Sequence, residues 1–110
     1  MTLSEARQLA LSLPEATEQP HHELSSFRVR GRIFATVARD QQHLHIFVDD
    51  LTREQAIELL PDVVEKLWWG EKVMGVRVAL PKIDARTLKD LLHKAWQRKA
   101  PKSLLRDQVC

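Results

Sequence analysis

Cysteine is almost absent from this sequence, and its scarcity sets the first limits on fold and function. The 110 residues contain one cysteine, Cys110, which is the last residue. A single thiol forms no intramolecular disulfide and no cysteine-based metal cluster. We therefore expect a domain that is held together by buried apolar side chains and that works in a reducing, cytoplasmic environment.

Long apolar runs and a large excess of one charge are also lacking. No stretch approaches the roughly 18 apolar residues of a membrane-spanning helix, and Glu5 stands where a signal peptide needs basic residues. The 17 lysines and arginines nearly balance the 15 acids, which leaves a net charge of +2. This balance excludes a polyanion binder that works by bulk charge, so binding would depend on local clusters. We expect no membrane partner and a single domain over residues 1–110.

Three stretches have the apolar spacing and the flanking residues of helices. The capping-box pair Thr2 and Glu5 predicts a first helix over residues 3–13. A second capping box at Thr52 predicts a short helix that ends before Pro61. Asp84 is the expected N-cap of a last helix, ended by a proline and buried along one stripe that comprises Leu88, Leu91, Leu92, Ala95 and Trp96.

Between the helices the apolar period changes from helical spacing to two, which is typical of strands. Residues 27–48 predict a three-stranded antiparallel meander, with Gly31 in its first turn and residues 39–42 in its second. In this alternation Phe34 and Phe47 fall on the face opposite the aliphatic residues. Residues 14–20 are interpreted as a connection, and residues 63–69 and 73–80 as further extended segments. The order predicts an α+β fold, an antiparallel sheet of about five strands with helices packed on one face.

Segments spread over nearly the whole chain resemble one known family. They are Ala10-Leu11-Ser12-Leu13-Pro14-Glu15-Ala16-Thr17-Glu18, Ser26-Phe27-Arg28-Val29 with Gly31 and Ile33-Phe34-Ala35, Trp69-Gly70, Val76-Arg77-Val78, and the stretch from Ala95-Trp96 to Ala100-Pro101-Lys102. In this order they resemble the MmcQ/YjbR-like proteins of bacteria. The resemblance implies a CyaY-like fold, a cytoplasmic bacterial protein, and binding of double-stranded DNA between two hairpin wings.

Basic residues on the predicted hairpins are the candidates for DNA contact, because arginine's forked side chain gives paired hydrogen bonds to phosphate. The first wing would contribute Arg28, Arg30 and Arg32, the second Lys72 and Arg77, and the last helix would extend the surface with Lys94, Arg98, Lys99 and Lys102. A purely structural interpretation, without DNA contact, competes with this one. Arginines also protect strand edges, and charged side chains form the outer face of any amphipathic helix.

Motifs for catalysis or metal binding are not recognisable in the sequence. It shows no Ser-His-Asp set, no glycine-rich phosphate loop and no paired-carboxylate pocket. His43 and His45 lie two apart on a predicted strand and supply only two of the ligands that a metal site needs. We therefore predict a non-enzymatic protein without a cofactor.

Trp68 and Trp69 leave two alternatives open. Adjacent tryptophans stack on bases in single-strand binders, or they place one ring in the core and seal a dimer. The leading hypothesis is a DNA-binding protein. The alternative is a protein-interaction or homodimerisation module that uses these tryptophans and the sheet face of Phe34 and Phe47. A small-molecule pocket between sheet and helices is a third interpretation.

Overall fold

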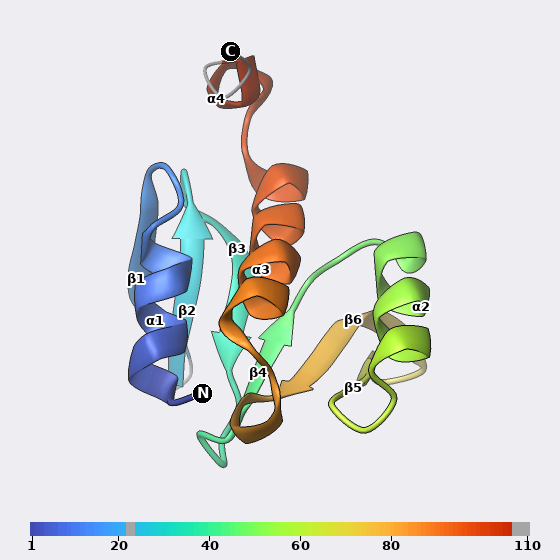
Figure 1. Cartoon of the computed structure of the whole chain (residues 1–110). Coiled ribbons are helices and arrows are strands. Elements are labelled where there is room, and N and C mark those ends of the chain that lie inside the picture. Colours follow the sequence, from blue (N-terminus) through green and yellow to red (C-terminus); the bar gives the residue numbers. More distant parts are fainter. Residues whose placement is uncertain (22–23, 107–110) are drawn as a thin grey trace.

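A six-stranded antiparallel sheet with helices on one face forms the described part of the chain (Figure 1). The structure is a computed structural model that describes residues 1–21 and 24–106. In chain order the elements are α1 (Leu3–Leu11), β1 (Ala16–His21), β2 (Leu24–Val29), β3 (Arg32–Val37), β4 (His43–Ile46), α2 (Asp50–Leu59), β5 (Val64–Trp69), β6 (Lys72–Ala79), the 3₁₀ turn η1 (Leu80–Lys82), α3 (Ala85–Lys99) and α4 (Lys102–Arg106). The predicted α+β class is confirmed, with one strand more than expected.

The strands lie in the order β1-β2-β3-β4-β6-β5, and every neighbouring pair is antiparallel. The predicted meander is therefore present as β2, β3 and β4. Its first turn is Arg30–Gly31, where both residues have positive φ angles of 51° and 81°, as a two-residue type I′ hairpin requires. Since β6 inserts between β4 and β5, the β5–β6 hairpin closes one edge of the sheet and β1 forms the other.

Helix ends form where the sequence supplies side-chain acceptors. Thr2 Oγ1 accepts from the Glu5 backbone N–H at 3.1 Å, and Glu5 Oε1 accepts from the Thr2 N–H at 3.0 Å, so the predicted capping box is confirmed. Asp84 caps α3 as predicted. The prediction for α2 was wrong by one turn, because Asp49 rather than Thr52 is the N-cap and accepts from the Thr52 N–H at 2.9 Å.

The segment interpreted as a connection, residues 14–20, contains strand β1 instead. Its six residues pair with β2 from Ala16 opposite Val29 to His21 opposite Leu24. Pro20 has no N–H to donate, and this is tolerated because β1 lies at the edge of the sheet. The interpretation as a connection was therefore wrong, because a proline is compatible with a strand at the edge of a sheet.

Phe34 lies in the core and not on the opposite face as predicted. The register between β2 and β3 shifts next to Phe27, so that Phe27 pairs with Ala35 while Arg28 pairs with Ile33. This β-bulge leaves Phe34 unpaired, and its side chain is fully buried in the core cluster. The alternation of side chains between the two faces of the sheet is therefore interrupted in β3 at this one extra residue.

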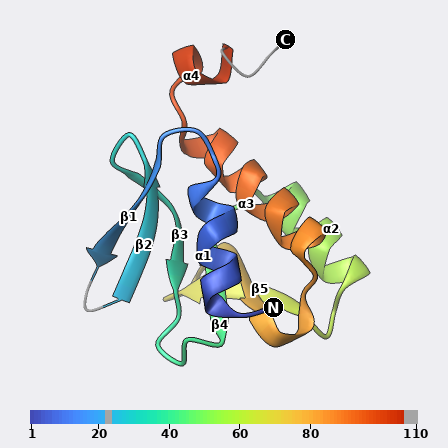
Figure 2. The same ribbon diagram turned by 60° about the vertical axis from the view of Figure 1, so that its left-hand side comes forward.

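The core lies between the sheet and the helices α1 and α3, which pack against each other (Figure 2). The predicted stripe of α3 is buried along its length, and Trp96 at its end is fully enclosed. The indole Nε1 of Trp96 donates to the carbonyl of Pro14 at 3.0 Å. This bond satisfies the one polar group of the largest core side chain and joins α3 to the start of the α1–β1 connection.

Gly75 marks the closest approach of β6 to the end of β4. A Cβ at this position would meet the carbonyl oxygen of Ile46 and would lie 3.0 Å from the Cα of Phe47. Because both neighbours are backbone atoms of the same sheet, relief needs a shift of β4 against β6. Only glycine is accommodated there without such a shift.

We expect Gly75→Ala to destabilise the fold by about 3 kcal/mol, the upper part of the range for overpacked interiors. Gly70→Ala is the matched control, because its Cβ meets nothing within 4 Å and only its φ of 63° is unfavourable. That substitution should cost about 1 kcal/mol. Urea denaturation followed by circular dichroism measures both, and equal midpoints for the two variants would contradict the close approach.

Candidate nucleic-acid interface

Both predicted wings point to the same end of the sheet. Ala35 of β3 pairs with Ile46 of β4, and Ile46 pairs with Val76 of β6. The antiparallel order therefore places the start of β3, the end of β4 and the start of β6 together. The β2–β3 turn at Arg30–Gly31 and the β5–β6 turn at residues 70–71 lie at this end.

The last helix ends there as well. Arg98 Nη1 donates to the carbonyl of Phe47, just beyond β4, at 2.9 Å. Partial burial lowers the pKa of the Lys99 ammonium below its ordinary value of 10.5, and the nearby charges of Arg98 and Arg32 lower it further. Arg32, Arg98 and Lys99 thus form a group of like charges, which we call the cationic cluster. Lys102 is exposed at the start of α4, three residues beyond it.

The acids close to the cationic cluster are few. Among the described residues no ion pair involves Arg32, Lys99 or Lys102. The charge of Arg98 contributes to the lowered pKa of Asp49, but hydrogen bonds from Thr52 are the main cause. The cluster therefore keeps most of its positive charge for an external ligand.

The other predicted contact residues are mostly engaged within the protein. Arg30 forms two hydrogen bonds with the carboxylate of Glu15, at 2.6 and 2.9 Å. Arg28 Nε donates to the hydroxyl of Ser26 at 3.0 Å, and Lys94 pairs with Asp90 at 3.2 Å. Lys72 is exposed at the start of β6. Of the nine basic residues predicted from the sequence, three come together in the cationic cluster, namely Arg32, Arg98 and Lys99.

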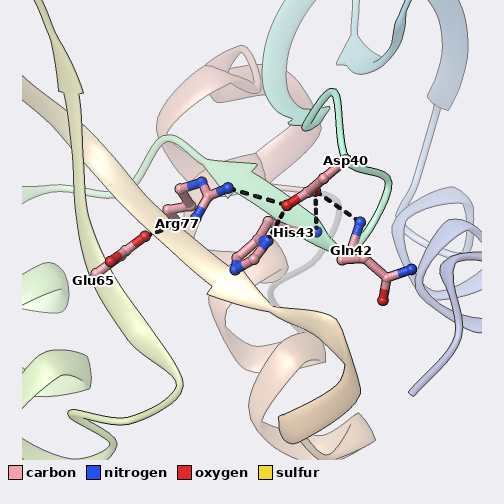
Figure 3. A network of polar contacts seen from close by, with 5 residues as sticks. All are labelled: Asp40, Gln42, His43, Glu65 and Arg77. Carbon is pink, nitrogen blue, oxygen red and sulfur yellow. Dashed lines mark hydrogen bonds and ion pairs between the residues drawn. The ribbon is translucent and has the colours of Figure 1, made fainter.

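Arg77 belongs to a network on the outer face of the sheet, the face that carries no helix (Figure 3). Its Nη1 donates to Glu65 Oε1 of β5 at 2.8 Å, and its Nη2 donates to Asp40 Oδ2 at 3.2 Å. The same Asp40 oxygen lies 2.7 Å from His43 Nδ1. Arg77 therefore joins the β3–β4 turn to the β5–β6 hairpin, and both of its terminal nitrogens are occupied.

Asp40 accepts hydrogen bonds from the backbone of the β3–β4 turn in addition to the one from Arg77. Its Oδ1 accepts from the backbone N–H groups of Gln42 and His43 at 2.9 and 3.1 Å (Figure 3). The bond from Gln42 is the main cause of a lowered pKa of this carboxyl, with smaller contributions from His43 and Arg77. An ionised Asp40 is thus the centre of a structural network, which explains why Arg77 is placed poorly for phosphate.

Next to this network the outer face is hollow. Two open hollows of about 720 and 700 Å³ and a smaller one of about 230 Å³ have His45 in their walls, and we call the three together the outer groove. Its apolar walls are large side chains, Phe47, Leu67, Trp68, Trp69 and Met74, and its polar walls include Thr36, Arg39 and Arg77. Trp68 and Trp69 are 58% and 73% exposed. The alternative in which one tryptophan enters the core is therefore wrong, since both side chains are exposed.

Comparison with known proteins identifies the family. The YjbR family model matches residues 11–98. The chain belongs to the YjbR family. The crystal structure of Deinococcus radiodurans protein DR2400, a DUF419 domain, is similar in fold with a TM-score of 0.71 at 24% identity, over 86% of this chain and 75% of that chain. No curated protein matches.

These findings confirm the family resemblance and the α+β class, while the CyaY-like detail of the fold stays a prediction. No helix within the described residues of this YjbR protein combines the length and the apolar character needed to cross a bilayer. The described residues also contain no group of three or more histidines, cysteines or acids arranged to hold a metal ion.

His45 gives the YjbR groove a titratable floor. The ring is half-buried between Thr36 of β3 and Arg77 of β6, its cross-strand neighbours. Burial lowers the pKa of His45 below its ordinary value of 6.5, the charges of Arg77 and His43 lower it further, and Asp40 and Glu65 partly oppose the shift. The folded protein therefore favours the neutral ring.

The stability of the fold should fall in mildly acidic solution because of His45. Its folded pKa lies below its unfolded pKa, so its contribution is complete above pH 6.5 and is lost as the pH falls towards the folded pKa. We expect His45→Gln to lose less stability than the wild type between about pH 7.5 and pH 5. Urea midpoints across this range measure the difference. Parallel curves for the two proteins would show that the burial of His45 has no such effect.

Proposed function

We propose that this YjbR-family protein is a non-enzymatic DNA-binding protein that contacts the phosphates of a duplex with its cationic cluster. The observation that supports this most is the grouping of Arg32, Arg98 and Lys99: burial is the main cause of the lowered pKa of Lys99, and the charges of Arg98 and Arg32 lower it further. Like charges repel one another, so an anion placed among them would relieve that repulsion. The proposal includes a bacterial cytoplasmic location, which the family resemblance and the single cysteine favour.

The chemistry of the cluster suits a phosphate backbone. Arg32 is exposed at the start of β3, and its fork offers paired donors to two phosphate oxygens. Arg98 spends one nitrogen on the carbonyl of Phe47, which fixes the direction of its guanidinium and leaves the other nitrogens for a ligand. Lys99 and Lys102 add two point charges. Phosphate contacts of this kind hold a duplex in place and carry no sequence information.

In this proposal the two hairpin wings contribute fewer phosphate contacts than the sequence predicts. Arg30 and Arg77 would each have to leave a carboxylate before binding DNA, at 2.6 Å from Glu15 and 2.8 Å from Glu65. Lys72 has no such partner among the described residues and lies at the same end of the sheet, so it remains a secondary contact. The end of α3 and Arg32 of the first hairpin therefore provide the contact, and the rest of the hairpins flanks it.

Duplex binding should be sensitive to salt to an extent that reports the number of contacts. With three to four phosphates neutralised, affinity should fall by about 40- to 150-fold between about 50 and 200 mM salt. In the variant Arg32→Gln/Lys99→Gln, affinity should fall at least tenfold and the slope of log K against log salt should decrease by about two. Fluorescence anisotropy with a labelled duplex measures both quantities.

The control removes the same charge elsewhere. Lys82 and Lys89 are exposed, without an ion pair among the described residues, on η1 and on the first half of α3. Lys82→Gln/Lys89→Gln therefore changes the net charge equally but leaves the cationic cluster intact. If both double variants lose affinity alike, or if micromolar protein binds no duplex at about 50 mM salt, the proposed contact is wrong.

A further inference from the structure

The outer groove has the lining of a binding site rather than of an ordinary exposed sheet face. Its two larger hollows, of about 720 and 700 Å³, are open to solvent, so a ligand would lie on them with one side exposed. Trp68, Trp69 and Met74 expose 58%, 73% and 36% of their surfaces around it. Large apolar side chains gathered in one hollow are uncommon on monomers, because their hydration is unfavourable, and they mark sites of contact.

The groove combines flat aromatic walls with a polar floor. Trp68 and Trp69 offer ring faces, on which planar heterocycles stack. Thr36 and His45 line the groove together with Trp69. The neutral His45 ring has one donor and one acceptor nitrogen, and the Thr36 hydroxyl has both functions, so together they match the hydrogen-bonding edge of a nucleobase.

Phe47 connects the outer groove to the cationic cluster. Its side chain lines the groove together with Trp69 and Met74. Its carbonyl accepts the hydrogen bond from Arg98 at 2.9 Å. One residue beyond β4 thus touches both sites, so phosphates held at the end of α3 and bases lying in the groove would belong to one continuous path over the end of the sheet.

We propose that the outer groove binds unpaired bases of single-stranded nucleic acid, with Trp69 as the main stacking platform. This inference rests on the proposed function, because the cationic cluster supplies the phosphate contacts of the same path. The bases of a duplex stack on each other and cannot reach a tryptophan face, whereas single-strand binders combine a positively charged track with aromatic platforms. The groove is the aromatic half of such an arrangement, and the cluster is the charged half.

The direct test compares a single strand with a duplex. The probe is a labelled oligothymidylate of about 15 nucleotides, the upper part of the site sizes known for single-strand binding modules. Trp69→Ala should weaken its binding by about 5- to 150-fold. The same variant should bind a duplex with unchanged affinity. Trp69→Phe, which retains a ring, should recover most of the lost affinity, and this rescue separates stacking from misfolding.

Intrinsic fluorescence gives an independent readout. Trp96 is fully buried, so quenching by added oligothymidylate would come from Trp68 and Trp69. We expect the quenching to decrease in Trp69→Ala and to persist in Leu59→Ala. Leu59 is a matched control, because its side chain is apolar, 78% exposed and located on α2 outside the walls of the groove.

The outcomes separate this inference from the proposed function. Tryptophan-dependent binding of the single strand without duplex binding supports the groove and contradicts the duplex proposal. Duplex binding that depends on Arg32 and Lys99, with single-strand affinity unchanged in Trp69→Ala, overturns the groove and leaves the duplex proposal intact. If sedimentation shows a dimer that Trp69→Ala converts to monomer while oligothymidylate affinity is unchanged, the groove faces a second copy of the chain, and the inference is wrong.

Discussion

Coverage of only one sheet face is the constraint on which the rest of this structure depends. The buried residues of α1 and α3 cover one side, where the core contains Phe27, Phe34 and Trp96. No helix of the described residues covers the opposite side, so its strands must remain compatible with water. They meet this requirement with charged and polar cross-strand neighbours such as Thr36, His45 and Arg77. These same three residues line the outer groove, together with the exposed Trp68 and Trp69.

Much of this architecture follows from local patterns. The apolar stripe of α3, the period of two through β2 to β4, and the capping box of α1 are each contained within a few turns or strands, so the sequence predicts them correctly. The errors lie where tertiary position overrides local preference. Pro20 is acceptable because β1 is an edge, and Phe34 is buried because one residue bulges out of the ladder. Neither condition is encoded within its own segment.

The candidate site was predictable in composition but not in arrangement. A sequence shows which residues are basic, but it does not show which acidic side chains they pair with in the fold. Arg77 meets Asp40 across 37 residues, and Arg30 meets Glu15 across 15. These pairs remove two arginines from the predicted DNA surface. Arg32 and Lys99 are separated even further along the chain and become neighbours because β3 and α3 pack together. The decisive information is thus the topology, which places the beginning of β3 at the end of α3.

Arg98 links the cationic cluster to the outer groove. Its Nη1 donates to the carbonyl of Phe47 at 2.9 Å, and its charge lowers the pKa of Lys99 in addition to the larger effect of burial. This bond fixes the position of Phe47 at the rim of the groove, and the close contact at Gly75 brings β6 and its hairpin against the same carbonyl end of β4. The two proposed sites thus share Phe47, whose carbonyl accepts from Arg98 of the cluster and which lines the groove.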